Sequence, residues 1–176
     1  MKQEVASFLD YVAHSPTVFQ ATQQACDMLD AAGFTRLSEH EAWEILPGGR
    51  YYVTRNRSAL VAFAVPENGF THCQIVASHG DSPTFKLKAH AEGEAAGAYI
   101  RLDVEPYGGM IMSTWFDRPL SIAGRALVRE DGRLVTRLID LDRDAVLIPN
   151  MPIHFNRDIN SGYSYNPQAD MLPLFG

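Results

Sequence analysis

Residues 59–65 form an uninterrupted apolar run, Ala-Leu-Val-Ala-Phe-Ala-Val, which constrains the fold more than any other segment. A continuous apolar run of this length is typical of a β-strand that is covered on both faces. It is far too short to cross a bilayer, which needs about 20 apolar residues. Further strands are expected over 51–54 and 72–78. The sequence therefore predicts a layered α/β domain with helices covering a sheet.

Two amphipathic helices are expected before these strands. Apolar residues over 5–12 recur at i, i+3, i+4 and i+7, which is the spacing of one helix face. A second apolar stripe runs over 18–32. We expect Ser15 to cap this helix with Pro16 at its first position, and Gly33 to end it, because serine, proline and glycine favour those positions.

The second half of the chain is expected to be β-rich. Residues 89–97 are small and polar, and we place a domain boundary there, between an α/β part over 1–88 and a β-rich domain over 89–176. The clearest element is a hairpin over 125–139. Its apolar strands flank Asp131-Gly132, a pair that favours a tight two-residue turn.

Composition excludes some classes of function. The formal net charge is −6, which argues against a nucleic-acid binder, because such proteins usually present a basic face. Arginines over 125–143 alternate with acidic residues, as on a solvated hairpin. The two cysteines, Cys26 and Cys73, form no CxxC pair and are expected to be reduced thiols. With no leader pattern and no membrane span, a cytoplasmic location is expected.

A possible metal ligand follows the strand expected over 72–78. That strand leads directly into His79-Gly80-Asp81, and ligands of open α/β sheets bind beyond the carboxyl ends of strands. A metal-binding imidazole usually donates its second N–H to a carboxylate, which His79 and Asp81 could provide, with Gly80 allowing a tight bend. A capping aspartate beside a structural histidine fits the same pattern. Ser78 beside His79 does not indicate a serine hydrolase, because no GxSxG motif is present.

Three segments, in order along the chain, resemble the M18 family of metallo-aminopeptidases, the aspartyl aminopeptidases. They are residues 77–88, which contain His79-Gly80-Asp81-Ser82-Pro83, residues 107–125, and residues 153–168. The resemblance covers nearly the whole chain, and three ordered motifs are more specific than any one of them. His154 lies in the third segment, where its pattern alone indicates a surface residue.

The resemblance implies an α/β peptidase domain with two Zn²⁺ ions and an inserted β-rich dimerisation domain. Family members release N-terminal residues, typically Asp or Glu, from peptides, and their dimers build larger, typically dodecameric, homo-oligomers. By this resemblance His79 is a zinc ligand and Asp81 the catalytic carboxylate that orients it. His154 is implied to reach the active site of a neighbouring subunit and to help hold the substrate there.

Two departures qualify this resemblance. Gly80 stands where threonine is common, and the family's other metal ligands and general-base glutamate lie further along a longer chain. We therefore expect an N-terminal portion that is inactive alone. The alternatives are a non-catalytic truncated relative that acts as an oligomerisation module, and another di-zinc exopeptidase family. Residues 115–125 and 153–160 disfavour the latter.

Overall fold

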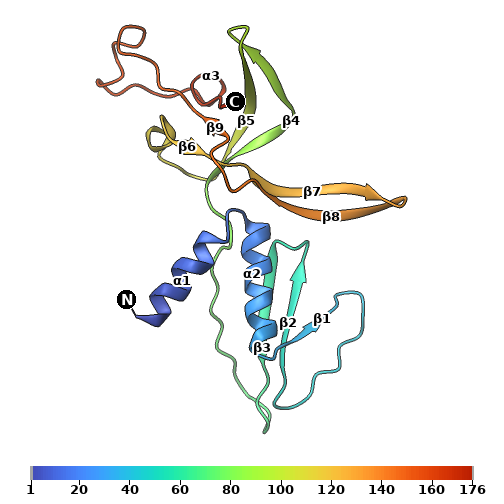
Figure 1. The fold of residues 1–176 in the computed structure, drawn as a ribbon. Helices are drawn as coiled ribbons and strands as arrows, with labels where there is room; N and C mark the ends of the chain where they lie inside the picture. Colours follow the sequence, from blue (N-terminus) through green and yellow to red (C-terminus); the bar gives the residue numbers. More distant parts are fainter. Residues whose placement is uncertain (1, 176) are drawn as a thin grey trace. The chain divides into compact units, whose positions relative to one another are not determined.

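The computed structural model describes residues 2–175, which form two compact units (Figure 1). The first unit consists of Met1–Asp81 together with Gly124–Leu138, and the second of Ser82–Ala123 together with Ile139–Gly176. The residue-89 boundary expected from composition falls inside a strand, Thr84–Ala95. The assignment of separate catalytic and dimerisation roles to 1–88 and 89–176 stays a prediction.

The first unit contains two helices and a three-stranded sheet. The elements are α1 (Gln3–Ala13), α2 (Val18–Ala31), β1 (Thr35–Leu37), β2 (Arg50–Arg55) and β3 (Ala59–Ala64). The sheet order is β1-β2-β3, with β1 parallel and β3 antiparallel to β2. The two amphipathic helices and the strands expected over 51–54 and 59–65 are thus confirmed.

Helix α2 begins two residues later than its sequence suggested. Its N-cap is Thr17, whose Oγ1 accepts a hydrogen bond of 3.2 Å from Phe19 N, so the expectation that Ser15 caps the helix is wrong. Threonine is itself a good N-cap, because its hydroxyl oxygen satisfies an orphan N–H of the first turn. Gly33 ends the helix as expected, in the left-handed region with φ 78°.

The core of the first unit is centred on Tyr52, which is fully buried between α2 and the sheet. The Tyr52 hydroxyl donates a hydrogen bond of 2.7 Å to Asp30 Oδ1 on α2. Burial, and this bond to a carboxylate, raise the pKa of Tyr52 to about 12. Tyr51, on the other face of β2, packs against Phe63 of β3 with ring centroids 5.6 Å apart.

Two expectations about the first sheet are wrong. Strand β3 is not covered on both faces, because Val61 is 61% exposed and β2 is its only strand partner among the described residues. Residues 72–78 form no strand at all, and Ile75 and Val76 are 81% and 98% exposed. An extended segment becomes part of a sheet only when a neighbour satisfies its backbone groups, and residues 2–175 supply none here.

The second unit is built on a five-stranded antiparallel sheet in the order β4-β5-β10-β9-β6. The strands are β4 (Thr84–Ala95), β5 (Tyr99–Tyr107), β6 (Pro119–Leu120), β9 (Val146–Leu147) and β10 (Leu174–Phe175). A 3₁₀ turn, η1 (Met112–Trp115), and a short helix, α3 (Pro167–Asp170), complete it. Its core is a cluster of Phe116, Ile148 and Met171. Trp115 packs edge-on against Phe85 at 5.1 Å beside this core.

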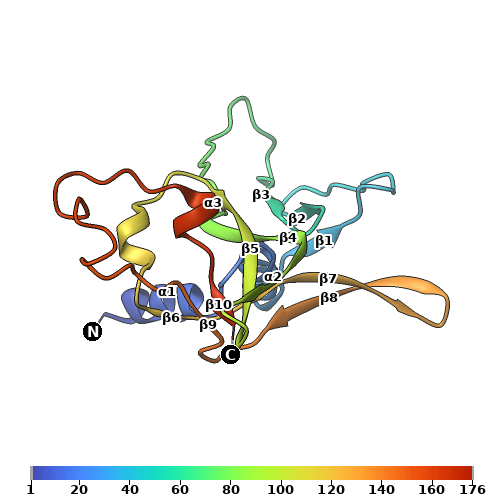
Figure 2. The same cartoon turned by 90° about the horizontal axis from the view of Figure 1, so that it is seen from above.

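The predicted hairpin is confirmed as a two-stranded ribbon of β7 (Ala123–Glu130) and β8 (Arg133–Asp140), whose strands run side by side in Figure 2. Asp131 and Gly132 both have positive φ, 48° and 77°, as a type I′ turn requires. Asparagine, aspartate and glycine tolerate this backbone region better than other residues do.

Among residues 2–175, none of the helices combines the length and the apolar character needed to span a bilayer.

Candidate metal centre

His79 and Asp81 are held together by the backbone that follows the exposed segment 72–78. His79 Nδ1 lies 2.8 Å from the backbone oxygen of Asp81 and 3.1 Å from Asp81 Oδ1. Both oxygens can only accept, so Nδ1 must carry the proton and donate it. In a neutral imidazole this leaves the lone pair on Nε2, the arrangement of a metal-binding histidine oriented by a carboxylate.

This pair is open to solvent in the structure. The side chain of His79 is 82% exposed and that of Asp81 is 37% exposed. Both lie in the first unit. An ion bound by His79 would therefore need further ligands and a cover from other residues, because zinc sites normally have about four ligands.

The backbone at position 80 does not require glycine. The tight bend expected there from the sequence is not present. The φ of Gly80 does not lie in the left-handed region, and a Cβ placed on it would lie 3.9 Å from Val18 Cγ2, an ordinary contact. Glycine in place of the family's common threonine therefore loses a side chain that there is room to accommodate. The segment's geometry does not depend on this departure.

The described residues do not complete a metal site. Within 2–175, no group of three or more histidine, cysteine, aspartate or glutamate side chains is arranged to hold an ion. His79 and Asp81 fit one ligand and its orienting carboxylate, and the rest of a zinc coordination sphere is not formed by these residues. His79 therefore fits one position of a zinc coordination sphere, and the described residues fill no other position.

His154 lies in an exposed turn of the second unit. The flanking Ile153 and Phe155 are 47% and 79% exposed, so the turn presents apolar side chains to solvent beside the imidazole. His154 and the His79–Asp81 pair belong to different units. A role for His154 in a neighbouring subunit's site stays a prediction.

A cavity of about 220 Å³ lies in the second unit, and sequence reasoning did not find it. Its lining includes Arg101, Phe116, Tyr163, Tyr165 and Asp170. The Tyr163 hydroxyl donates a 3.0 Å hydrogen bond to Asp170 Oδ2, which raises the pKa of Tyr163. These residues come from distant parts of the chain, so no local sequence signal could have grouped them.

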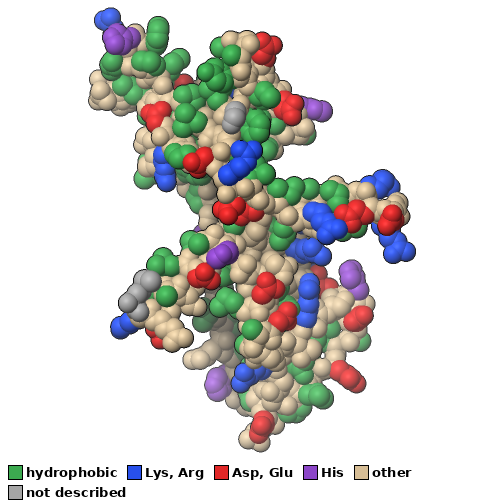
Figure 3. All heavy atoms as spheres, viewed as in Figure 1, with side chains coloured by type: hydrophobic (Ala, Val, Ile, Leu, Met, Phe, Trp, Pro, Cys, Tyr) green, Lys and Arg blue, Asp and Glu red, His purple; other side chains and the backbone are tan. Residues whose placement is uncertain are grey.

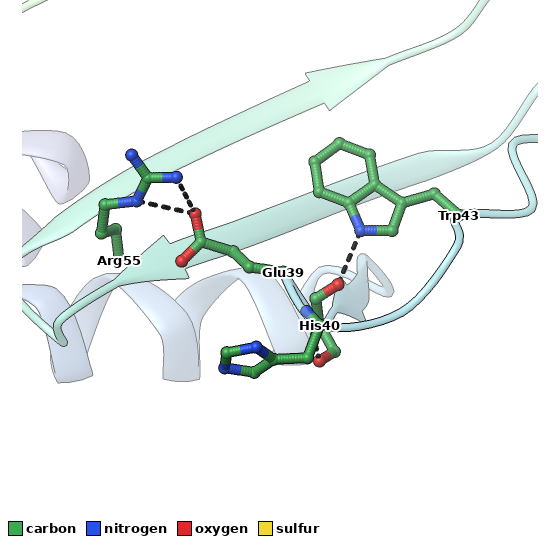
Figure 4. A network of polar contacts seen from close by, with 5 residues as sticks. Glu39, His40, Trp43 and Arg55 are labelled. Carbon is green, nitrogen blue, oxygen red and sulfur yellow. Dashed lines mark hydrogen bonds and ion pairs between the residues drawn. The ribbon is translucent and has the colours of Figure 1, made fainter.

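A polar network in the first unit holds the loop before β2 (Figure 4). Arg55 on β2 donates from Nε at 2.8 Å and from Nη2 at 2.7 Å to the same carboxylate oxygen of Glu39. This carboxylate raises the pKa of Arg55. Trp43 Nε1 donates a 2.7 Å hydrogen bond to the Ser38 carbonyl, and this bond joins the two ends of the 38–43 segment.

Comparisons with known proteins identify the family of this chain. A sequence model of the family described as aminopeptidase I zinc metalloprotease (M18) matches residues 11–176. A probable M18 family aminopeptidase 2 of Clostridium acetobutylicum is 43% identical over all of this chain and 42% of its own length. Aspartyl aminopeptidase 1 of Schizosaccharomyces pombe is 43% identical over 96% of this chain and 37% of its own.

Solved structures give the same result. A chain in the cryo-EM structure of an Ape4 and Nbr1 complex superposes with a TM-score of 0.91 at 41% identity, over 97% of this chain and 33% of that one. The mApe1 dodecamer of S. cerevisiae superposes with a TM-score of 0.79 at 26% identity, over 98% of this chain and 38% of that one. The chain thus spans about two fifths of the length of the curated relatives it matches. On the family match and these identities, the chain belongs to the M18 family of zinc aminopeptidases.

Proposed function

We propose that this chain is part of a zinc-dependent aminopeptidase that releases N-terminal residues, chiefly Asp or Glu, from peptides. The observation that carries the proposal is the His79 imidazole, whose Nδ1 is tied to Asp81 and whose Nε2 is left to bind a cation. The preference for acidic residues is supported by the name of the fission-yeast relative, an aspartyl aminopeptidase.

The role of Asp81 is to position the ligand. Its carboxylate and backbone oxygen both accept from Nδ1, which fixes the tautomer and the ring orientation and makes Nε2 more basic. Two zinc ions, held in part by His79, would supply a Lewis acid that polarises a carbonyl and activates water. A glutamate outside the described residues is proposed to act as general base, as the family resemblance implies.

His154 is proposed to contact the substrate from a neighbouring subunit. Its exposed turn in the second unit supports this role, because an imidazole buried within its own unit could not reach another chain. Mixed dimers of two inactive variants, His154→Phe and His79→Ala, test it in the full-length protein. One intact metal site would then meet one intact His154, so partial activity should return. No recovery in heterodimers that demonstrably form would contradict action in trans.

A homo-oligomer is proposed as the working assembly. The budding-yeast mApe1 structure is that of a dodecamer, and the similarity of this chain to it supports dimers that build a larger particle. We infer a cytoplasmic location from the unpaired cysteines of the sequence. The division into an α/β part over 1–88 and a dimerisation domain over 89–176 belongs to the same proposal.

One observation favours a second candidate, a non-catalytic oligomerisation module. Within residues 2–175, no group of three or more histidine, cysteine, aspartate or glutamate side chains is arranged to hold a metal ion. We therefore expect the 176-residue chain alone to have no peptidase activity, whichever candidate holds.

Hydrolysis of Asp- and Glu-anilides separates the two candidates. The protein expressed from its complete gene should hydrolyse them in the presence of zinc, and His79→Ala should abolish that turnover. The variant His72→Ala, which changes an exposed histidine on the same segment, is the matched control and should keep it. Absent hydrolysis by the complete protein would refute the peptidase proposal and favour the module. Zinc-independent hydrolysis would refute the zinc-dependent mechanism.

A further inference from the structure

The segment that carries His154 connects Ile148 to helix α3 and contains no regular helix or strand. We call these residues, 149–166, the His154 loop. In Figure 3 a histidine and apolar side chains lie at the outer end of this loop, which joins β9 to α3 in Figure 1. An exposed loop keeps a side chain in one place only if contacts with the rest of the unit hold it there.

Asp117 holds the first end of the loop. Its backbone N–H donates a 2.9 Å hydrogen bond to the Ile148 carbonyl, and its Oδ1 accepts a hydrogen bond of 2.9 Å from Asn150 N. The neighbouring Phe116 forms a β-bridge with Ile148. Asp117 therefore joins the residues on both sides of position 149 to a part of the chain that lies 33 residues before Asn150.

Asp117 adopts a backbone conformation that most residues avoid. Its φ is 54°, in the left-handed region, where a Cβ lies too close to the following carbonyl oxygen. Among residues with a side chain, aspartate and asparagine tolerate this region best. Such conformations persist only where the surrounding contacts hold them. The same residue thus supplies both a left-handed turn and the acceptor for the Asn150 amide.

Asp170, on α3, holds the other end of the loop. Its Oδ2 accepts hydrogen bonds from the Tyr163 hydroxyl at 3.0 Å and from Asn166 N at 2.7 Å. Tyr165, which lies between these two residues in the chain, packs against Phe116 with ring centroids 5.1 Å apart. Each end of the loop is therefore tied to the rest of the second unit through an aspartate carboxylate.

The middle of the loop, which contains His154, has contacts of a different kind. Phe155 N and Asn156 N both donate hydrogen bonds to the Pro152 carbonyl, at 2.9 and 3.2 Å, so these bonds join close neighbours within the loop. Asn156 and Ile159 line the cavity of about 220 Å³ in the second unit, so part of the loop faces open space instead of packed side chains. The position of His154 therefore depends on the two anchored ends.

We propose that Asp117 and Asp170 are positioning residues that hold the His154 loop in the conformation in which His154 reaches the substrate. The inference rests on the substrate-binding role proposed above for His154 and names the residues through which that role is achieved. Each carboxylate already accepts hydrogen bonds from the loop, so both aspartates act through His154 and not by contacting the substrate themselves.

Hydrogen exchange of the complete protein tests the anchoring directly. Asp117→Gly keeps the left-handed backbone, which glycine adopts freely, but removes the acceptor, so amides over 149–166 should exchange at least about fivefold faster. Asp117→Asn keeps both the backbone and an acceptor oxygen and should restore slow exchange. The matched control is Asp142→Gly, because Asp142 also has a positive φ, 45°, in the second unit but lies outside the loop. It should leave the exchange of the loop unchanged.

Hydrolysis of an Asp-anilide, measured together with zinc content, tests the catalytic consequence. Asp117→Gly should lower kcat/KM by up to roughly 100-fold at unchanged zinc content, because a small displacement of a substrate-holding group can cost that much. Asp117→Asn should restore it. In mixed dimers, Asp117→Gly should gain activity with His79→Ala, whose His154 loop is intact. It should gain none with His154→Phe, which has the same defect.

Three results would overturn the proposal. The first is loop exchange that Asp117→Gly does not change, whatever happens to activity. The second is faster exchange at unchanged kcat/KM, which would make the anchor structural only. The third is a loss of activity that is not recovered in mixed dimers with His79→Ala, which would place the defect in the variant's own metal site.

A second variant keeps the proposal testable if Asp117→Gly does not fold. Tyr163→Phe removes one of the two hydrogen bonds to Asp170, and the same measurements of exchange, kcat/KM and mixed dimers then decide. A wild-type protein without zinc-dependent hydrolysis would refute the peptidase proposal and, with it, the catalytic part of this inference. Hydrogen exchange separates the two failures, because it reports the anchoring of the loop without any substrate.

Discussion

The two sheets of this molecule differ in how far the chain covers its own apolar surface. In the second unit, β10 is paired on both sides, with β5 and β9, and Ile148 and Met171 are fully buried beneath the sheet. In the first unit, the sheet stops at β3, and the apolar segment 72–78 runs past it without a strand partner among the described residues. His79 and Asp81, which we propose as a zinc ligand and its orienting carboxylate, lie at the end of this unpaired segment.

The two units therefore differ in where buried core residues and candidate functional residues lie. Among the described residues, the hydrophobic core of the second unit contains no candidate metal ligand, whereas the open segment 72–78 leads to His79 and Asp81. A catalytic group must remain reachable, and residues that the chain does not cover are available for further ligands and for substrate.

Ile148→Ala should destabilise the second unit by about 3 kcal/mol, because it opens a cavity in a fully buried core. Each unit contains one tryptophan, Trp43 in the first and Trp115 in the second, so the variants Trp43→Phe and Trp115→Phe allow fluorescence to follow urea unfolding of each unit separately. The matched control is Leu147→Ala, since Leu147, the preceding residue at the end of β9, is 39% exposed. Equal losses from both variants would show that the core is not closed as described.

Asp81→Asn should weaken zinc binding to the complete protein by roughly 10- to 100-fold while leaving its fold intact, because the amide orients the imidazole less well than a carboxylate. The measurement is zinc retained on dialysis against a chelator of graded strength. Asp103→Asn is the matched control, a half-buried carboxylate in the second unit that pairs with Arg101. Unchanged zinc affinity in the Asp81 variant would remove this residue from the metal site.

Tyr52→Phe should destabilise the first unit by about 1 kcal/mol, because it deletes a buried hydrogen bond to Asp30. The pH dependence gives a second readout. The folded-state pKa of Tyr52 is raised to about 12, so the folded protein holds this proton more tightly than the unfolded chain, whose tyrosines titrate near 10.

The stabilisation from Tyr52 is therefore fully present below about pH 10 and is lost as the pH rises towards 12. Urea unfolding followed through Trp43 should show a steeper loss of stability over this window in the wild type than in Tyr52→Phe. Parallel curves for the two proteins would show that Tyr52 titrates normally in the fold.

Val76→Ala should change stability by less than about 0.5 kcal/mol, whereas Val104→Ala should cost about 2 kcal/mol. The two valines differ in exposure, 98% on the open segment and 2% on β5, although the substitution is the same. A large loss from Val76→Ala would mean that residues 72–78 are covered in solution, by another chain or by a further part of this one.

Local signals in the sequence predicted the elements whose causes are local. Helical spacing gave α1 and α2, and Asp131-Gly132 gave the ribbon, because a positive-φ turn depends on residues at the turn itself. The pairing of His79 with Asp81 was also predictable, since the two residues are neighbours in the chain. Their roles at a zinc site came only through the family resemblance.

Features that depend on distant residues were not predictable. Apolar residues over 72–78 indicated a buried strand, but a strand needs a neighbour that residues 2–175 do not supply. Strand β4 was not predicted at all, and the small and polar side chains over 89–95 resemble a linker until β5 pairs with them. The cavity between Arg101 and Tyr163 was invisible for the same reason.

The position of β10 in the second sheet has a consequence for folding during synthesis. Leu174 pairs with Arg101 on one side and with Leu147 on the other, so the pairing of β5 and β9 through β10 forms only when β10 has left the ribosome. The β2–β3 pairing of the first unit joins residues that are close in sequence and can form much earlier. Nascent chains that pause before residue 174 should therefore have formed the first sheet while the second sheet is still incomplete. Chaperones that recognise unpaired strands would bind the second unit at that stage.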